Sequence, residues 1–437
     1  MKNDNKHFSR LKSFYKITST YKKQFLAVTI AISTIFGTGG CGKDNKEGES
    51  SIYLVDLTDK YEDEAILYDS KTGEEISMET DEEGFLYPQI DGTCCIHCDC
   101  CHRSCPVEYP IPLRGPKAGI VGYNTEPDVR LQSASGGAFR AIVDTLDSGT
   151  IVFGAEWTTR STVAHSWAYA KEAYERFTGS KYVQSQVGMS FAECKSFLEE
   201  GKRVLFSGTP CQIAALRTYL GKSYARLTCV DIVCHGVPCS KTLENCISSR
   251  ESHKRDKIAA IHFRRKRKIN NHWNSKCVET QYVKGNSTVN SPEKDSYMRG
   301  FSYGLFFRPS CSECPFSTVE RCSDITIGDA WGIERVYPEM NVHQGVSLLL
   351  VNSSQGELMI DSIRQHMYLK DVPIETLVSG NARLKGPDKG HNMRGFFFEM
   401  QDRKNFDKLI YRCIPKATTV KVLGYRVKCA LNDRRKA

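Results

Sequence analysis

The sequence predicts an α/β (α+β) protein in which a small cysteine-rich module precedes a larger domain. From residue 118 onward, short buried apolar runs alternate with amphipathic stretches and glycine turns, the pattern of an open sheet flanked by helices. Before that domain, residues 94–100 alone hold four of the 19 cysteines. Such crowding indicates metal ligation rather than disulfides, and the 437 residues suffice for two or three domains.

The first 50 residues predict a leader with an apolar anchor and a linker. Lys22 and Lys23 precede an apolar run, 25–36, that ends in Gly39-Gly40-Cys41. The run is too short to span a bilayer and resembles a signal segment with a lipoprotein cleavage site. Two readings stay open: a cytoplasmic protein with membrane-surface association through residues 22–41, or an exported lipoprotein attached through Cys41. Clustered thiolates favour the reducing compartment, hence the cytoplasm.

Residues 51–110 predict an iron–sulfur module. After an acidic stretch, 51–90, comes the run Cys95-x2-Cys98-x2-Cys101-x3-Cys105-Pro106, the spacing that bacterial ferredoxins use for a 4Fe-4S cluster. Zinc is the alternative metal to the iron–sulfur cluster, because histidines, which also bind zinc, lie in the run. A second run is missing, so we expect one cluster here, with Cys105 or a cysteine from elsewhere as its fourth ligand.

The larger domain follows a connector, 106–116, and its elements come from the apolar spacing. We expect these in order: an amphipathic stretch at 138–146, a strand at 151–155, a helix at 191–200, a strand at 203–206, a helix at 212–220, and strands at 227–233 and 347–352. The run Arg264–Lys268 is interpreted as a solvated loop. With few aromatic residues interleaved and a net charge of only +9, nucleic-acid binding is not expected.

A second cysteine group lies at Cys311-x2-Cys314-Pro315, followed by Cys322. Two cysteines at this spacing before a proline fit an iron–sulfur or zinc half-site. We therefore predict that Cys311 and Cys314 are metal ligands. A second cluster is the candidate group that they hold.

Two glycine turns are candidates for phosphate binding. Residues 133–137 and 207–212 each precede a predicted helix, where backbone N–H groups suit a phosphate. A plain turn with a helix cap needs the same residues, so both interpretations stay open. His235 and Asp329 each follow an apolar strand, where clefts of open sheets form, and are the candidate catalytic residues.

Ordered motifs from 76 to 400 resemble the beta subunit of coenzyme F420 hydrogenases and dehydrogenases. They are Gly119-Ile-Val-Gly-Tyr-Asn, Ser135-Gly-Gly, Gly179-Ser-Lys-Tyr-Val-Gln, Leu205-Phe-Ser-Gly-Thr-Pro-Cys-Gln, Asp231-Ile-Val-Cys-His-Gly-Val-Pro, Arg308-Pro-Ser-Cys-x2-Cys and Ser323-Asp-Ile-Thr-Ile-Gly-Asp-x-Trp-Gly. The resemblance implies a partial ferredoxin-like module at 51–110, N- and C-terminal family domains at 115–190 and 191–400, and a basic tail at 401–437.

The resemblance also implies the cofactors. It implies an FAD-binding α/β oxidoreductase domain fed by 4Fe-4S clusters, with these flavin-site candidates: Ser135, Gly136, Gly137, Lys181, Ser207, Gly208, Thr209, Gln212 and Asp329. The expected function is electron relay between a redox partner protein, such as a ferredoxin or a hydrogenase-like subunit, and a small-molecule acceptor. That acceptor is coenzyme F420-like or another organic molecule. The alternative is a zinc- or cluster-bound scaffold without catalysis, linked to polysaccharide biosynthesis.

Overall fold

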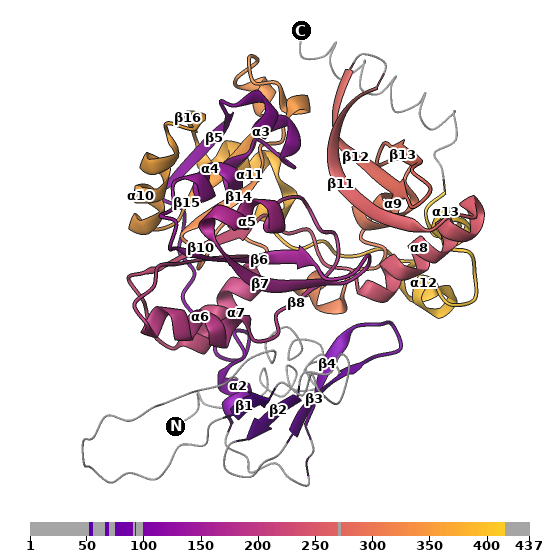
Figure 1. Ribbon diagram of the computed structural model, residues 1–437, viewed down its shortest axis with the longest axis horizontal. Helices are drawn as coiled ribbons and strands as arrows, with labels where there is room; N and C mark the ends of the chain where they lie inside the picture. Colours follow the sequence, from indigo (N-terminus) through magenta and orange to yellow (C-terminus); the bar gives the residue numbers. More distant parts are fainter. Residues whose placement is uncertain are drawn as a thin grey trace, which may run out of the picture.

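The computed structural model describes residues 52–55, 66–69, 75–90, 92, 99–269 and 272–415 (Figure 1). The predicted leader, the lipoprotein cysteine Cys41 and most of the basic tail lie outside these residues. Within the described part of the chain, no helix is long and apolar enough to cross a membrane.

The N-terminal part forms a small antiparallel sheet with strand order β1-β2-β3-β4. Its strands are β1 (Ile52–Val55), β2 (Ile66–Asp69), β3 (Glu75–Thr80) and β4 (Leu86–Ile90), and the short helix α2 (Cys100–Arg103) follows. In Figure 1 this sheet lies below the main body of the molecule.

A nine-stranded mixed sheet forms the centre of the molecule, in the order β16-β5-β15-β14-β10-β9-β6-β7-β8. Its strands are β5 (Ala118–Asn124), β6 (Ile151–Trp157), β7 (Val163–Tyr169), β8 (Ser185–Gln186), β9 (Val204–Gly208), β10 (Leu227–Ile232), β14 (Ile325–Asp329), β15 (Ser347–Val351) and β16 (Met367–Val372). The pairings make β5, β14, β10, β9 and β6 run in the same direction. Their carboxyl ends therefore meet at one edge of the sheet.

Alternate residues of the strands serve two separate cores, as the period of two requires. Leu205 packs with one face of the sheet, whereas its neighbours Val204 and Phe206 pack with the other. The helices α4 (Ala138–Asp144), α5 (Ala170–Phe177) and α10 (Ser354–Ile363) cover the first face, and α6 (Ser190–Glu199), α7 (Pro210–Leu220) and α11 (Ile374–Gly380) cover the second. The shorter elements are α3 (Pro127–Gln132), η1 (Pro309–Glu313), η2 (Ile333–Arg335), η3 (Val342–Gln344) and η4 (Ala382–Leu384).

A third sheet packs with helices of the C-terminal half around a separate aromatic core. It consists of β11 (Ile258–Ile269), β12 (His272–Tyr282) and β13 (Ser287–Asn290), with the helices α8 (Ser240–Lys254), α9 (Ser296–Ser302), α12 (Arg394–Met400) and α13 (Phe406–Cys413). The interpretation of Arg264–Lys268 as a solvated loop is wrong. These residues continue strand β11, because β12 pairs with them, and Lys266 is buried.

The other predicted elements of the larger domain are confirmed. The strands β6, β9, β10 and β15 and the helices α4, α6 and α7 lie within two residues or so of their expected bounds. The connector 106–116 contains no helix or strand beyond an isolated bridge between Arg114 and Arg321. The central sheet takes strands from both sides of residue 190.

The β3–β4 turn docks on the C-terminal half. Phe85 is buried in the aromatic core, and both carboxylate oxygens of Glu83 accept hydrogen bonds from the Arg394 guanidinium. The backbone carbonyl of Glu83 also accepts from Gln401 at 3.2 Å. These contacts hold the end of the N-terminal sheet beside the site described next.

Candidate functional site

A cavity of about 820 Å³ opens at the carboxyl edge of the central sheet. Residues that follow β9, β10 and β14 line it, where open α/β sheets bind ligands. Of the residues predicted to bind the flavin or to act in catalysis, the cavity is lined by Ser135, Gly137, Lys181, Ser207, Gly208, Thr209, Gln212, His235 and Asp329. Gly136 is absent from this lining.

Four cysteines from three separate segments meet in this cavity. Cys311 and Cys314, the predicted half-site, line it together with Cys211 at the start of α7 and Cys234 after β10. Besides burial, the charges of Cys311, Cys211 and Cys314 each raise the pKa of the Cys234 thiol, so the four thiols lie within electrostatic range of one another. A four-cysteine donor set is what a 4Fe-4S cluster requires.

Among the residues that the structure describes, no group of three or more Cys, His, Asp or Glu side chains is close enough to hold a single metal ion. A cubane cluster is larger than an ion, so its four thiolates stand further apart. Burial raises the pKa of Cys311 to about 11 and that of Cys314 to about 12, so both thiols are protonated at neutral pH and must lose their protons to ligate a metal.

Arg308 brings a positive charge next to these thiols. Its side chain is 1% exposed and donates to Gln184 Oε1 at 3.2 Å and to the carbonyl of Leu86 at 3.0 Å. Its guanidinium lies 4.3 Å from the ring centroid of Tyr87. The charges of Cys311 and Cys211 act on it, so the cation and the thiols share one low-dielectric region.

The first predicted cluster is only partly described. Cys101 lies in α2, and Cys105 is fully buried. Cys95 and Cys98 lie outside the described residues, so this ligand set stays a prediction. Pro106 and Val107, directly after Cys105, line the cavity. The cysteine run therefore ends at the same site as the four-thiol group.

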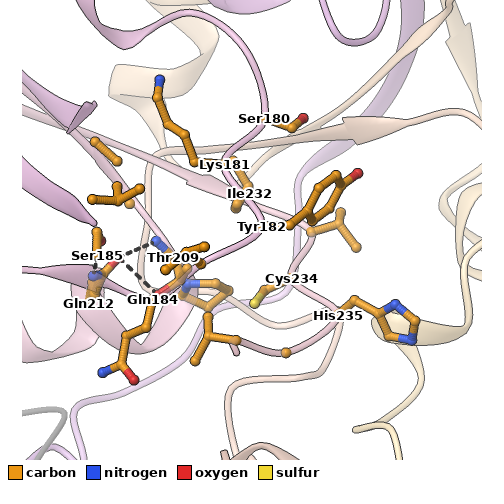
Figure 2. A pocket seen from close by; sticks show the side chains of 18 of the residues that line it. Ser180, Lys181, Tyr182, Gln184, Ser185, Thr209, Gln212, Ile232, Cys234 and His235 are labelled. Carbon is orange, nitrogen blue, oxygen red and sulfur yellow. Dashed lines mark hydrogen bonds between the residues drawn. The ribbon is translucent and has the colours of Figure 1, made fainter. Parts of the chain in front are cut away.

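The turn after β9 has a defined structural role. Thr209 and Gln212 form a capping box at the start of α7, in which Gln212 Oε1 accepts from the Thr209 amide at 2.9 Å. Gln212 also donates to Ser185 Oγ at 3.0 Å. Thus the helix-cap interpretation of this turn is confirmed, while both side chains still line the cavity, as Figure 2 shows.

His165 completes this network. Its Nε2 lies 3.0 Å from the carbonyl of Ser207 and therefore carries the proton, which leaves Nδ1 to accept from Ser185 Oγ at 2.9 Å. Burial lowers the pKa of His165 to about 4, so the ring is neutral at physiological pH. Through these two hydrogen bonds the neutral imidazole connects β8 to the end of β9.

The turn at 133–137 packs against the end of the sheet. Gly136 donates to Ser347 Oγ at 2.9 Å, and a Cβ atom on it would lie 2.5 Å from the carbonyl oxygen of Gly122. Gly137 has a φ of 93°, which favours glycine. Close backbone approach thus accounts for Gly136, whereas Ser135 and Gly137 line the cavity.

The carboxylate of Asp329 is held by Arg264. Both oxygens accept hydrogen bonds from the guanidinium at 2.8 Å. Burial alone would raise the pKa of Asp329, but Arg264 outweighs it and holds the pKa below its usual value. Asp329 is therefore ionised and fixed in place rather than poised to move a proton.

Lys181 and His235 also have partners within the chain. The Lys181 ammonium donates to the carbonyls of Phe177 and Thr178 at 3.0 Å, and burial lowers its pKa to about 8. His235 Nε2 lies 2.7 Å from Asp388 Oδ2, and burial lowers the pKa of this histidine despite the carboxylate. Figure 2 shows Lys181 and His235 with Cys234 around the cavity. His235 and Asp388 form a dyad with a set tautomer.

The sequence interpretation did not single out Cys211, Cys234 or His165, all of which line the cavity. The two cysteines had a usable signal, because each follows a buried strand and a short turn. Since β9 and β10 are parallel neighbours, their carboxyl ends meet at one edge. His165 lies within strand β7, where no motif or residue spacing in the sequence marks it as part of a site.

Together, the fold and the site define an α/β protein with a ligand cavity and a four-cysteine group at the carboxyl edge of its sheet. Residues 201–376 match the family model for the C terminus of the coenzyme F420 hydrogenase/dehydrogenase beta subunit. The similarity to this family is confined to that segment. No curated protein matches the chain.

Several solved structures are similar to this chain, and one of them comes from the F420-reducing NiFe hydrogenase complex of Methanosarcina barkeri, derivatised with xenon. The match has 16% sequence identity and a TM-score of 0.40, and it covers 70% of this chain and 90% of that one.

Proposed function

We propose that this chain is an iron–sulfur flavoprotein oxidoreductase. In the proposal, bound 4Fe-4S clusters supply single-electron transfer and bound FAD supplies two-electron transfer to or from a coenzyme F420-like or other organic acceptor. One observation carries the proposal: Cys211, Cys234, Cys311 and Cys314 open into the same cavity as the predicted flavin-site residues. The donor set fits a cluster, and a cavity of about 820 Å³ fits a cofactor-sized ligand.

The chain's own residues have defined tasks in this proposal. The four cysteines hold one cluster at the inner part of the cavity, and Arg308 offsets their negative charge. Thr209 and Gln212 fix the turn on which Cys211 sits. Ser135, Gly137, Gly208 and Lys181 line the part assigned to the flavin.

The proposal extends to the rest of the chain. The run Cys95–Cys105 holds a second cluster next to the first, where a ferredoxin or a hydrogenase-like subunit would exchange electrons. The proposal keeps 51–110, 115–190 and 191–400 as its family segments, of which the last two share the central sheet. The need for reduced thiolates supports a cytoplasmic location, with membrane-surface association through residues 22–41.

Anaerobic purification with iron, zinc and flavin quantified tests this function. We expect about eight irons per chain from two clusters, broad absorption near ~400 nm, and bound FAD. Cys98→Ser removes part of the iron but leaves the flavin, whereas Cys246→Ala, in the core of α8 away from the cavity, changes neither. Zinc without iron or flavin would overturn the proposal in favour of a scaffold.

A further inference from the structure

A group of basic residues lies at one end of the cavity. The β11–β12 hairpin forms this end. Arg264 and Lys276 from this hairpin line the cavity, together with Trp331 and Ser135. Lys266 lies just behind, where its ammonium donates to the carbonyls of Arg130 and Ser135. The hairpin belongs to a different sheet from the rest of the cavity edge, as Figure 1 shows.

The backbone of β11 is bent where it reaches the cavity. Arg264 has a φ of 61°, which is unusual for a residue other than glycine, and the pairing with β12 shifts register on either side of Arg265. Bulges of this kind re-aim a side chain. Here the bulge directs the Arg264 guanidinium to Asp329 and to the carbonyl of Ala134 at 2.9 Å.

Positive charge exceeds negative charge at this end. Asp329 neutralises Arg264, but among the described residues no carboxylate pairs with Arg130, Lys266 or Lys276. The guanidinium of Arg130 donates to the carbonyls of Gly345 and Asn341 at 3.0 Å. The carboxylates of Asp329 and the exposed Glu293 act on Lys276 only at a distance, and Asp329 is already paired with Arg264.

One of these cations is held away from bulk water, and another is exposed to the cavity. Lys266 is only 4% exposed, and burial lowers its pKa to about 7. Lys276 is exposed and lines the cavity, and its ammonium lies 3.7 Å from the ring centroid of Trp331. A buried cation without a counter-ion, such as Lys266, is costly unless an anion joins it.

We propose that this basic end binds a phosphate or pyrophosphate group of a bound ligand. Lys276 makes the direct contact, Trp331 flanks it, and Lys266 adds positive potential from behind the 133–137 turn. The inference rests on the proposed function for the ligand's identity. Phosphate comes from either of two sources, the FAD pyrophosphate or an acceptor that carries its own phosphate.

The test compares ligand binding to the full chain and to the variant Lys276→Gln by calorimetry. The probes are inorganic pyrophosphate, FAD and riboflavin. We expect Lys276→Gln to weaken pyrophosphate binding about tenfold or more, the usual effect of losing one charge-assisted hydrogen bond. Lys276→Arg keeps the charge and restores most of the affinity, which separates charge from misfolding.

Lys284→Gln is the matched control, because Lys284 is exposed in the turn between β12 and β13 and the substitution removes the same charge from the same sheet. Equal pyrophosphate affinities in Lys276→Gln and Lys284→Gln overturn the inference. If Lys276→Gln weakens FAD but not riboflavin, the flavin's phosphates occupy the site. If it weakens pyrophosphate alone, the acceptor's phosphate does.

Failure of the proposed function gives a different pattern. In that case the wild-type chain binds neither FAD nor riboflavin, yet pyrophosphate binding still depends on Lys276. The basic end would then serve another phosphorylated ligand.

Discussion

Arg308 joins the β3–β4 hairpin to the thiol group. It is buried, donates to the carbonyl of Leu86 and packs its guanidinium on Tyr87. Removing it leaves the Gln184 amide and the Leu86 carbonyl without this donor in a buried place. Such losses lower the free energy of unfolding, because a hydrogen bond no longer offsets the cost of desolvating these polar groups.

We therefore expect Arg308→Leu to lower the free energy of unfolding by about 2–4 kcal/mol. Arg203→Leu is the control, since its ion pair with Asp147 is exposed and contributes about 0–1 kcal/mol. Urea unfolding of both variants measures the difference. Equal midpoints for the two variants would show that Arg308 has no such role.

Lys266 makes stability depend on pH. Burial lowers its pKa to about 7, whereas an unfolded lysine titrates near ~10.4. Between these values the unfolded chain binds one proton more, so the free energy of unfolding rises with pH, by at most about 1.4 kcal/mol per unit. The contribution is least favourable below pH 7, where the buried lysine is charged in both states.

The variant Lys266→Met removes this titration. In phosphate-free buffer, the wild-type free energy of unfolding minus that of the variant should increase from pH 7 to 8.5. Unfolding curves taken at several pH values give this difference. A difference that does not change with pH would contradict the assignment.

At the scale of elements, the turn at 133–137 fits its site only because Gly136 has no side chain. A Cβ atom there would lie 2.5 Å from both the Gly122 oxygen and the Ser347 nitrogen. We expect Gly136→Ala to cost about 1–3 kcal/mol, as overpacking does. Gly149→Ala, where nothing lies within 4 Å, should change stability little. Thermal unfolding distinguishes them, and equal melting temperatures would contradict the account.

Buried strands and helices with clear apolar spacing could be predicted from sequence, as β9, α7 and β10 show. The strand β11 could not, because Arg264–Lys268 reads as a charged run. Its burial depends on partners in β12, β14 and the 133–137 turn that lie far away in sequence. Cys211 and Cys234 carry no ligand signal in their spacing, and only their positions after the parallel strands β9 and β10 indicated that they would lie at one edge of the sheet.

At the scale of the whole molecule, the small N-terminal sheet reaches the cavity through one turn. Glu83 forms the ion pair with Arg394, and Phe85 fills the aromatic core. The sheet that carries the predicted cysteine run is thus anchored next to the four-thiol group.

We expect Glu83→Ala to loosen this anchor. Amide hydrogen exchange of residues 81–87 should become faster, because the Arg394 guanidinium loses its bidentate partner. Glu339→Ala, which breaks an exposed pair with Lys370, is the control and should leave these amides unchanged. Unchanged exchange in Glu83→Ala would mean that Phe85 alone holds the turn.

The four-cysteine cluster site is the central claim, and iron content with low-temperature EPR tests it most directly. Cys234→Ser is compared with Cys239→Ser, because both cysteines line the cavity but only Cys234 faces the other thiols. The account predicts that Cys234→Ser loses about four irons and one reduced-cluster signal, while Cys239→Ser retains both. Unchanged iron and EPR spectra in Cys234→Ser would contradict it.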